Sequence, residues 1–334
     1  MSTTIRDVAE EADVSVATVS RVLNESDNVK ASTEERVLKA ARALNYHPSE
    51  TARSLRTQKT RTAGVLLPNM HGEFFAQVTH GLDRRAREEG HHLLVSNSHT
   101  DESEAELVIR SLLGRVDGLI ILWPRLTVRF LESLVPESLP VVLLNTSAGQ
   151  SRFKSLSFNN RTGAYAAVQH LAEHGHERVA ILTGGPENFD AQERLAGYRA
   201  AVDDCGLVAD SSLELEGDFT REAGRAMVER FLDLAPRPTA LFASNDSMAI
   251  GALRGLHDAG LEVPQDVALV GFDDIPTARY VTPPLTTVHA PTQELGERAM
   301  DQILKRLDNE TPPSHQTLET HLVSRASCGC TSTE

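Results

Sequence analysis

Apolar positions near the start of the chain recur with the spacing of a short amphipathic helix. The pattern i, i+3, i+4, i+7, which places side chains on one helix face, is followed by Ile5, Val8, Ala9 and Ala12. Thr4 stands at the N-cap position, and Asp7 lies three residues on, where its carboxylate can meet free N–H groups of the first turn. This segment is therefore expected to be a capped helix.

A second helical pattern follows after a break at residues 13–15. Ser15 can cap this helix, which is expected to run to about Asn24. Its inward residues are Val19, Val22 and Leu23, and its outward residues are Val16, Ala17, Ser20 and Arg21. Two short helices joined by a tight turn are typical of a helix-turn-helix, whose second helix enters the DNA major groove. An ordinary helical hairpin fits these residues equally well.

The next residues favour the DNA-binding alternative. A third helix is predicted at Thr33–Leu44, which can close a small core of three helices. Tyr46-His47-Pro48 should be extended, because proline disfavours the helical region for the residue before it. A short helical stretch can follow from Ser49 to Leu55. Between residues 52 and 61 there are no acidic residues and four basic ones, Arg53, Arg56, Lys59 and Arg61.

From Ala63 onward, apolar runs alternate with helical stretches. The first half contains the strand candidates Ala63–Leu67, Leu93–Ser96, Gly118–Leu122 and Val141–Leu144. The second half contains Val179–Thr183, Leu213–Glu216, Thr239–Ala243 and Val267–Phe272. Near-continuous apolar strands separated by helices predict parallel sheets covered on both faces. The body is therefore expected to consist of two similar α/β halves.

The opening TIRDVAEEADVSVATVSRVLN, the NYHP turn and the ARSL segment before a basic linker resemble the LacI/GalR family of transcription regulators. The likeness extends over essentially the whole chain. It implies an α/β fold in which a three-helix helix-turn-helix head and a hinge helix are joined to a two-lobed, periplasmic-binding-protein-like core of parallel sheets. The expected divisions are a DNA-binding domain at 1–47, a hinge helix and linker at 48–61, and an effector-binding and dimerisation core at 62–334.

Within that core, the family fold implies that the chain crosses between the lobes more than once. Pro291–Leu307 is therefore expected to pack back on the first lobe. The N-lobe is predicted at about 62–159 and 291–318, and the C-lobe at about 160–290 and 319–328.

Length and charge agree with several domains of different character. At 334 residues the chain exceeds what one hydrophobic core organises. Its net charge is −14, yet residues 1–61 hold ten Lys/Arg and nine Asp/Glu, a net charge of +1, which leaves −15 on the remainder. An acidic body is repelled by phosphates, whereas the head is nearly neutral with a locally basic hinge.

The cysteines and hydropathy predict a reduced compartment. Cys205, Cys328 and Cys330 form no disulfide framework, and they are too few to indicate a metal site, so neither a metal nor a cofactor is predicted. No apolar run has the length of a membrane span, and the N-terminus begins with a polar cap and a helix rather than an export signal. The expected location is the cytoplasm, associated with the nucleoid.

The predicted effector site lies in the loops that follow the strands, because open parallel sheets bind ligands at the carboxyl ends of their strands. These loops bring together amides, carboxylates, an arginine and aromatic rings, which suit a sugar. By resemblance, the strongest candidates are Phe75, Arg194, Asn245 and Asp273, accompanied by Trp123, Asn145, Asn159, Asp190 and Phe219. Structural roles remain open, since Trp123 can be a core residue and Asp246 can cap the helix after Asn245.

The predicted DNA contacts follow from the helix-turn-helix and from the resemblance. Val16, Ala17 and Arg21 are expected at base edges, since arginine binds guanine O6 and N7 together and small apolar groups contact thymine methyls. Thr18 and Ser20 are expected at phosphates, which fix register. The full predicted set is Thr4, Ser15, Val16, Ala17, Thr18, Ser20, Arg21, Asn28, Tyr46, Ala52, Arg53, Leu55 and Arg56.

These features predict a regulator, most simply a repressor of carbohydrate-utilisation genes. It is expected to bind a palindromic double-stranded operator as a homodimer and to respond to a small sugar or sugar derivative. A purine co-repressor is the alternative ligand. An enzyme is not predicted, because the motifs GxGxxG after a strand, GxxxxGK[ST] and GxSxG are absent. A periplasmic sugar receptor would need an export signal and has no use for residues 1–60.

Leu55 provides the first testable prediction. By resemblance, this leucine is a wedge that each subunit inserts into a minor-groove step, where it kinks the duplex. Ala52 is small enough for two such hinge helices to approach, and a helix this short should form only with DNA and its twin. We expect Leu55→Ala to weaken operator binding strongly while leaving ligand affinity nearly intact, as measured by DNA and ligand titrations. Equal losses for operator and random DNA would disprove the wedge.

Overall fold

The computed structural model describes residues 3–23, 29–46, 59–68, 72–97, 102–123, 127–146, 149 and 151–330. The chain divides into two compact units, Met1–Thr60 and Arg61–Glu334, here called the head and the core. None of the helices in these described ranges is both long and apolar enough to cross a membrane.

The described part of the head contains three helices, α1 (Ile5–Glu11), α2 (Val16–Leu23) and α3 (Ala31–Ala43). Their apolar faces meet in a small core, whose fully buried members include Val8, Val19 and Val37. The predicted inward and outward faces of α2 are confirmed, because Val22 is buried whereas Val16 is 41% exposed. The three-helix head expected from the sequence is therefore present.

Polar side chains begin the first two helices where the sequence predicted them. The backbone N–H and the hydroxyl of Thr4 both donate to Asp7 Oδ2, at 2.7 and 2.9 Å. The backbone hydrogen bond, followed by that from the hydroxyl, lowers the pKa of Asp7. At α2, Ser15 Oγ accepts from the backbone N–H of Thr18 at 3.2 Å. At α1 the carboxylate of Asp7 therefore accepts from the N-cap residue, whereas at α2 the N-cap hydroxyl accepts from a backbone donor that a helix start leaves unpaired.

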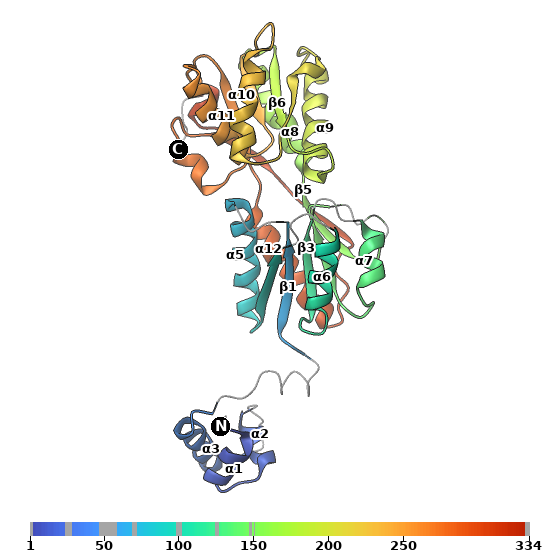
Figure 1. Ribbon diagram of the computed structural model, residues 1–334, viewed down its shortest axis with the longest axis vertical. Helices are drawn as coiled ribbons and strands as arrows, with labels where there is room; N and C mark the ends of the chain where they lie inside the picture. Colours follow the sequence, from blue (N-terminus) through green and yellow to red (C-terminus); the bar gives the residue numbers. More distant parts are fainter. Residues whose placement is uncertain are drawn as a thin grey trace. The chain divides into compact units, whose positions relative to one another are not determined.

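Two six-stranded sheets organise the core (Figure 1). The N-lobe sheet has the order β11-β5-β4-β3-β1-β2, and each of its neighbouring pairs is parallel. Its strands are β1 (Thr62–Leu67), β2 (His92–Asn97), β3 (Gly118–Leu122), β4 (Val141–Leu144), β5 (Lys154–Phe158) and β11 (His315–Leu318). Its helices are α5 (Glu73–Glu88), α6 (Glu102–Leu112), α7 (Val128–Leu134) and α12 (Thr292–Leu307).

The C-lobe sheet has the order β12-β10-β9-β8-β6-β7, and only its edge strand β12 is antiparallel among these described strands. Its strands are β6 (Val179–Thr183), β7 (Glu214–Glu216), β8 (Ala240–Ala243), β9 (Ala268–Asp273), β10 (Thr286–His289) and β12 (His321–Val323). Its helices are α8 (Asn160–Glu173), α9 (Phe189–Asp204), α10 (Arg221–Leu232) and α11 (Asp246–Asp258), with 3-10 turns η1 (Ser211–Leu213), η2 (Pro276–Arg279) and η3 (Ala326–Cys328).

The chain passes between the lobes three times, after β5, after β10 and after β11. The second crossing leads into α12, which packs on α5 and on β3, β4 and β5 of the N-lobe. The return of Pro291–Leu307 to the first lobe is therefore confirmed. The fold class is also confirmed, because two largely parallel sheets with helices on both faces follow a three-helix head.

Alternation along the strands supplies a separate hydrophobic layer for each face of a sheet. In β1, Val65 and Leu67 pack in the layer that includes α5 and α12, whereas Leu66 between them packs with α6 and α7. In β3, Ile120 and Ile121 divide in the same way. Since successive side chains point to opposite faces of a strand, an uninterrupted apolar run is buried on both sides.

Four short strands were not predicted from the sequence. These are β5, β10, β11 and β12, whose residues include many Ser, Thr and His side chains. A predicted strand was also too long, because Leu213 closes the 3-10 turn η1 and the strand β7 begins only at Glu214. Apolar runs alone do not identify strands whose buried residues are polar.

The helices α5 and α12 approach each other closely through two glycines. A Cβ on Gly81 would overlap the backbone carbonyl oxygen of Gln293, and one on Gly296 would overlap that of Val78. In both cases the obstacle is backbone, which cannot rotate away as a side chain can. Reciprocal glycines therefore set the spacing of this helix pair.

Substitution of Gly81 tests this close approach. We expect Gly81→Ala to lower the free energy of unfolding of the core by about 1–3 kcal/mol, the usual cost of overpacking. Chemical unfolding followed by circular dichroism measures the change. His80→Ala, at an exposed position of the same helix, is the matched control and should leave the midpoint unchanged. A Gly81→Ala protein as stable as this control would show that the helices separate without cost.

Candidate functional site

The exposed face of α2 is the candidate DNA-reading surface. Val16, Ala17 and Arg21 are exposed, as a helix that contacts base edges requires. Ser15 and Thr18 bind each other through their hydroxyls at 2.9 Å, so a phosphate contact would compete with this bond. Ser20 is half-buried on the same helix.

The other predicted DNA-contacting residues are only partly covered by the structure. Thr4 is exposed at the start of α1, and Tyr46 packs against the head core. Five further predicted contacts, Asn28, Ala52, Arg53, Leu55 and Arg56, lie outside the described residues.

A buried cluster of charged and amide side chains lies at the carboxyl ends of the core strands. Its centre is Arg194 on α9, which is 2% exposed. Arg194 Nε donates to Asn160 Oδ1 at 2.8 Å, and Nη1 donates to the Ser244 carbonyl. Nη2 lies 3.2 Å from Asp273 Oδ1, an ion pair. The guanidinium carbon lies 3.7 Å from the centroid of the Phe272 ring, a cation–π contact.

Asp190 extends this cluster to the N-lobe. It lies one helical turn before Arg194 on α9, so both side chains project from the same face. Asn160 Nδ2 donates to Asp190 Oδ1, and Asn145 Nδ2 donates to Asp190 Oδ2, each at 2.8 Å. Asn145 directly follows β4 of the N-lobe, so this hydrogen bond joins the two lobes.

Burial raises the pKa of both carboxyl groups of the cluster, Asp190 and Asp273. Burial raises the pKa of Asp273 to about 7, a rise that Arg194 opposes and Asp190 reinforces. Burial also raises the pKa of Asp190, against the effects of Arg194 and of the two asparagine amides. Two carboxylates and one guanidinium share the cluster, so it carries more hydrogen-bond acceptor capacity than its own donors satisfy.

Backbone strain concentrates at the same edge of the core. Residues with positive φ include Asn145 (50°), Phe219 (70°), Asp273 (107°) and Asp274 (57°). Such conformations are unfavourable for residues with a side chain and persist where the surroundings enforce them, commonly at ligand sites.

Asn245 has a structural role at the start of α11. Its Oδ1 accepts from the backbone N–H of Met248 at 2.8 Å, and its Nδ2 donates to the Phe219 carbonyl at 3.1 Å. The expectation that Asp246 caps this helix was wrong, because Asn245 is the N-cap. Asp246 is instead fully buried, where it accepts from the Ile275 backbone N–H and the Thr287 hydroxyl.

Three aromatic candidates differ in exposure. Phe75 is half-buried on α5, with its ring edge-on to Phe74 at 5.4 Å. Phe219 is half-buried and packs its ring over Gly184. Trp123 is 2% exposed and packs edge-on to Phe130 in the layer of α6 and α7, as expected of a core residue.

Asn159 lies apart from the cluster. Its Nδ2 donates to Glu319 Oε2 at 3.2 Å, between two crossing segments of the chain. The next residue, Asn160, is 1% exposed and contacts both Asp190 and Arg194. Asn160 was not predicted from the sequence, although the pair Asn159-Asn160 offers two amides at this position.

A second junction of the lobes lies at the start of α5. Glu73 accepts from the Thr277 backbone N–H at 2.9 Å and from its hydroxyl, and it lies 3.3 Å from Arg221 Nη2. Glu73 belongs to the N-lobe and both partners to the C-lobe, so these contacts join the two lobes. Glu73 was not predicted from the sequence as a contact of this kind.

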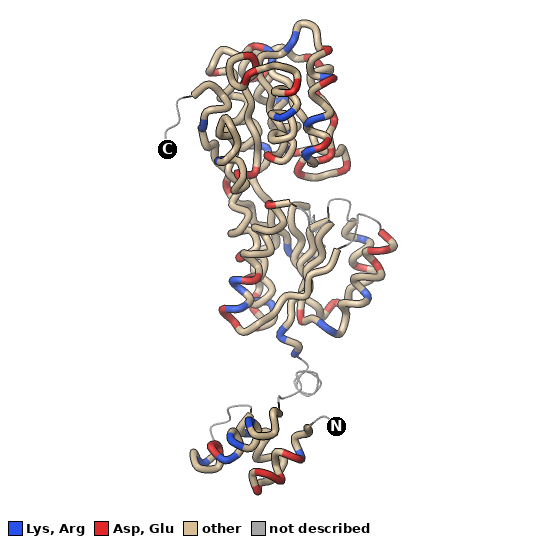
Figure 2. The backbone as a smooth tube through the Cα atoms, turned by 60° about the vertical axis from the view of Figure 1, so that its left-hand side comes forward, with Lys and Arg blue, Asp and Glu red and all other residues tan. Residues whose placement is uncertain are grey.

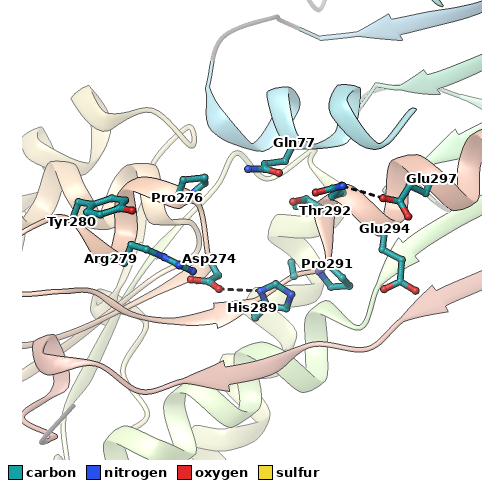
Figure 3. Close-up of a pocket in the computed structure, with 12 residues that line it drawn as sticks. Gln77, Asp274, Pro276, Arg279, Tyr280, His289, Pro291, Thr292, Glu294 and Glu297 are labelled. Carbon is teal, nitrogen blue, oxygen red and sulfur yellow. Dashed lines mark hydrogen bonds and ion pairs between the residues drawn. The ribbon is translucent and has the colours of Figure 1, made fainter. Parts of the chain in front are cut away.

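Next to this junction the described residues form an open pocket of about 490 Å³ (Figure 3). Its lining includes Gln77 from α5, Asp274 and Arg279 from the C-lobe, and Glu294 and Glu297 from α12. Asp274 binds His289 across the floor at 3.0 Å. None of the predicted effector residues lines this pocket, so it is distinct from the Arg194 cluster. The N-lobe loops at 69–71, 98–101, 124–126 and 147–148 lie outside the described residues.

Charge does not mark either lobe as a nucleic-acid surface. Acidic and basic positions are interspersed over the described parts of both lobes (Figure 2). Within those parts, the group of side chains with metal-ligand spacing comprises His170, Cys328 and Cys330, away from the Arg194 cluster.

A helix-turn-helix head and a two-lobed core with a polar cluster between the lobes define a class of protein, the ligand-responsive transcription regulators. Residues 4–49 match the family model of bacterial regulatory proteins of the lacI family, and residues 168–328 match that of the periplasmic binding protein-like domain. The HTH-type transcriptional repressor PurR of Aliivibrio fischeri (strain MJ11) is 36% identical over 311 residues, which cover 92% of each chain. The chain belongs to the lacI family and is a DNA-binding transcription regulator.

Solved structures agree with this assignment. The Lac repressor dimer bound to operator and the anti-inducer ONPF superposes with a TM-score of 0.90 at 31% identity, covering 98% of this chain and 99% of that one. The complex of the transcriptional regulator CelR with cellobiose gives a TM-score of 0.75 at 32% identity, covering 97% and 99%.

The raised pKa of Asp273 predicts a pH-dependent stability. Its pKa is about 7 in the folded chain against an ordinary value of 3.8, so between these values the folded chain holds a proton that the unfolded chain has lost. The contribution of Asp273 to stability therefore falls as the pH rises from about 4 to about 7. We expect Asp273→Asn to remove a slope on the order of 1.4 kcal/mol per pH unit in unfolding experiments across this window.

The neighbouring Asp274 provides a control of opposite sign. Burial raises its pKa, but hydrogen bonds from His289 and Arg325 outweigh burial and hold the pKa at about 2. Asp274 thus contributes stability that is lost only as the pH falls below about 4. Asp274→Asn should lower the free energy of unfolding yet keep the slope between pH 4 and 7 that Asp273 produces. An Asp273→Asn profile parallel to that of the unsubstituted protein would contradict the assignment of the slope.

Proposed function

We propose that this regulator is a repressor that binds a palindromic operator as a homodimer and responds to a small sugar or sugar derivative between the lobes of its core. Carbohydrate-utilisation genes are the proposed targets, and the cytoplasm, at the nucleoid, is the proposed location. No catalytic reaction is proposed. The observation that carries the proposal is the Arg194 cluster, to which both lobes contribute.

The chemistry of the cluster favours a neutral ligand rich in hydroxyl groups. When ionised, Asp190 and Asp273 together can accept more hydrogen bonds than Arg194 and the two asparagine amides donate. Each sugar hydroxyl brings a donor, whereas a phosphate or carboxylate would bring a further negative charge beside two buried carboxylates. The Phe272 ring is occupied by the guanidinium, so Phe75 and Phe219 remain the candidates to pack against the C–H face of a sugar.

The relatives support the ligand class and also supply its alternative. A similar regulator, CelR, has been solved with cellobiose, which is a sugar. The similarity to PurR is the reason that a purine co-repressor is the second candidate ligand. The N–H groups of a purine base can also donate to Asp190 and Asp273. Both ligand classes offer donors to the acceptor-rich cluster. A sugar inducer would release the operator and a purine co-repressor would promote its binding, so the two proposals predict opposite effects on DNA binding.

Allosteric control is proposed to act through the junctions of the lobes. The Asn145–Asp190 hydrogen bond spans the lobes at the cluster, and the Glu73–Thr277 hydrogen bonds span them at the start of α5. A ligand that competes for Asp190 alters the first junction and so changes the relative stability of the open and closed cores. This coupling is reciprocal, so operator DNA must change ligand affinity by the same factor.

Selection of bound duplexes from a random pool tests the proposal directly. The full-length protein is presented with the pool alone, with a panel of sugars and with a panel of purines. We expect a palindrome to be enriched without ligand and released by one sugar. A palindrome bound only in the presence of a purine would establish the co-repressor alternative. If no sequence is enriched under any condition, the proposal is wrong.

Variants of the cluster test where the ligand acts. We expect Arg194→Ala to abolish the ligand response while operator binding persists. Removing one partner from a buried ion pair lowers the free energy of unfolding by about 3–5 kcal/mol, so Arg194→Ala is also expected to destabilise the core. Asn145→Ala leaves the contacts of Arg194 intact and is the gentler variant. It should weaken the response of DNA binding to ligand at least tenfold. Asn159→Ala is the matched control, because its amide binds Glu319 instead. Release curves with ligand that are unchanged in the Asn145 variant would remove the cluster from the site.

A further inference from the structure

Two imidazoles and two thiols converge on the C-lobe, away from the Arg194 cluster. Cys330 Sγ lies 3.4 Å from His170 Nε2, 3.1 Å from His174 Nε2 and 2.9 Å from Cys328 Sγ. The ligand atoms of His170, Cys328 and Cys330 all lie within 4.8 Å of one another. These side chains come from positions about 160 residues apart in the chain.

The local backbone brings each pair together. His170 and His174 are four residues apart at the C-terminal end of α8, where such side chains are neighbours, and their rings lie 4.3 Å apart. Cys328 closes the turn η3, and Gly329 follows in the left-handed conformation, with φ of 87°. A residue with a side chain rarely adopts this conformation, so Gly329 suits the tight turn that places both thiols on one side.

Further hydrogen bonds orient the nitrogen and sulfur atoms. His174 Nδ1 lies 2.7 Å from the His170 carbonyl oxygen. Because a carbonyl can only accept, Nδ1 carries the proton and Nε2 presents its lone pair toward Cys330. Thr286 Oγ1 accepts from the Arg325 backbone N–H at 2.8 Å and donates its own hydrogen to Cys328 Sγ at 3.1 Å. Metal-binding imidazoles and thiolates are commonly supported by such outer contacts.

We propose that His170, His174, Cys328 and Cys330 form a zinc-binding site. Two thiolates and two imidazoles are the ligand set of tetrahedral structural zinc, whose atoms lie about 3.3–3.8 Å apart given metal–ligand lengths of about 2.0–2.3 Å. Cys330 Sγ lies 2.9–3.4 Å from the other three ligand atoms, slightly closer than these tetrahedral separations, so the Cys330 side chain must shift to admit the ion. Sulfur ligands select zinc over magnesium or calcium, which prefer oxygen.

The charge and access of the site suit a divalent ion. On binding, each of the two thiols loses a proton to solvent, and the two thiolates neutralise the two positive charges of Zn²⁺. This neutrality matters because Cys328 is 2% exposed. His174 is exposed and provides the side from which the ion enters. The bound ion would join the end of α8 to the C-terminal turn of the C-lobe.

The test is a zinc titration of the full-length chain, kept reduced, stripped of metal and freed of any affinity tag. Competition with a chromophoric chelator measures affinity, and the thermal midpoint measures the stabilisation that binding produces. We expect one Zn²⁺ per chain and a raised midpoint. Cobalt should also bind and give the strong visible absorption of tetrahedral cobalt with thiolate ligands.

Single substitutions identify the ligands. His174→Ala and Cys330→Ser, at the exposed and half-buried positions, should each weaken zinc binding by more than about tenfold. His176→Ala and Cys205→Ser are the matched controls, since His176 binds Thr239 and Cys205 ends α9. Both controls should retain full affinity, and circular dichroism checks that each variant folds.

Three results would overturn the proposal. The first is the absence of zinc binding by the reduced, folded chain. The second is binding that His174→Ala and Cys330→Ser leave unchanged, which would place the ion elsewhere. The third is binding that the Cys205 or His176 control also loses. If mass spectrometry finds a Cys328–Cys330 disulfide and the reduced chain binds no zinc, the pair is a redox site instead.

Discussion

The buried guanidinium of Arg194 is the interaction on which the carboxyl edge of the core depends. It contacts Asn160 at the start of α8, the Ser244 carbonyl after β8 and Asp273 at the end of β9, and it stacks on Phe272. A charge with so little access to water is stable only when it is paired and hydrogen-bonded. Each contact therefore holds the end of another element in place. The hydrogen bond between Asp190 and Asn145 links these elements to the N-lobe.

The strands that could be predicted from the sequence are those that use apolar side chains on both faces, as β1 and β3 do. The missed strands β5 and β10 bury polar residues whose partners come from remote segments. Ser155 Oγ bonds His315 Nδ1, and the Thr287 hydroxyl bonds Asp246. Such residues are stable in a sheet only because these partners exist, and pattern along the chain cannot show partners that lie more than forty residues away.

The buried polar cluster was predictable in its centre and less so at its rim. Arg194 and Asp273 were identified because a family resemblance and the strand-end rule agree on them. Asn160 was missed in favour of Asn159, since one residue at a helix start turns a side chain by about 100°. The residues of the proposed zinc site were harder still to predict from the sequence. Two cysteines near the C-terminus do not by themselves indicate a metal site. They do so only when folding brings His170 and His174 beside them.

The lobe junctions are the contacts on which the proposed control by a small ligand would act. Asp190 has a partner in the N-lobe, the Asn145 amide, so the two lobes are joined at the cluster. In the proposed mechanism, a ligand that hydrogen-bonds Asp190 competes with this partner. It can therefore shift the equilibrium only by the difference between its contacts in the open and closed states. Glu73, which accepts hydrogen bonds from Thr277 at the start of α5, gives the lobes a second contact.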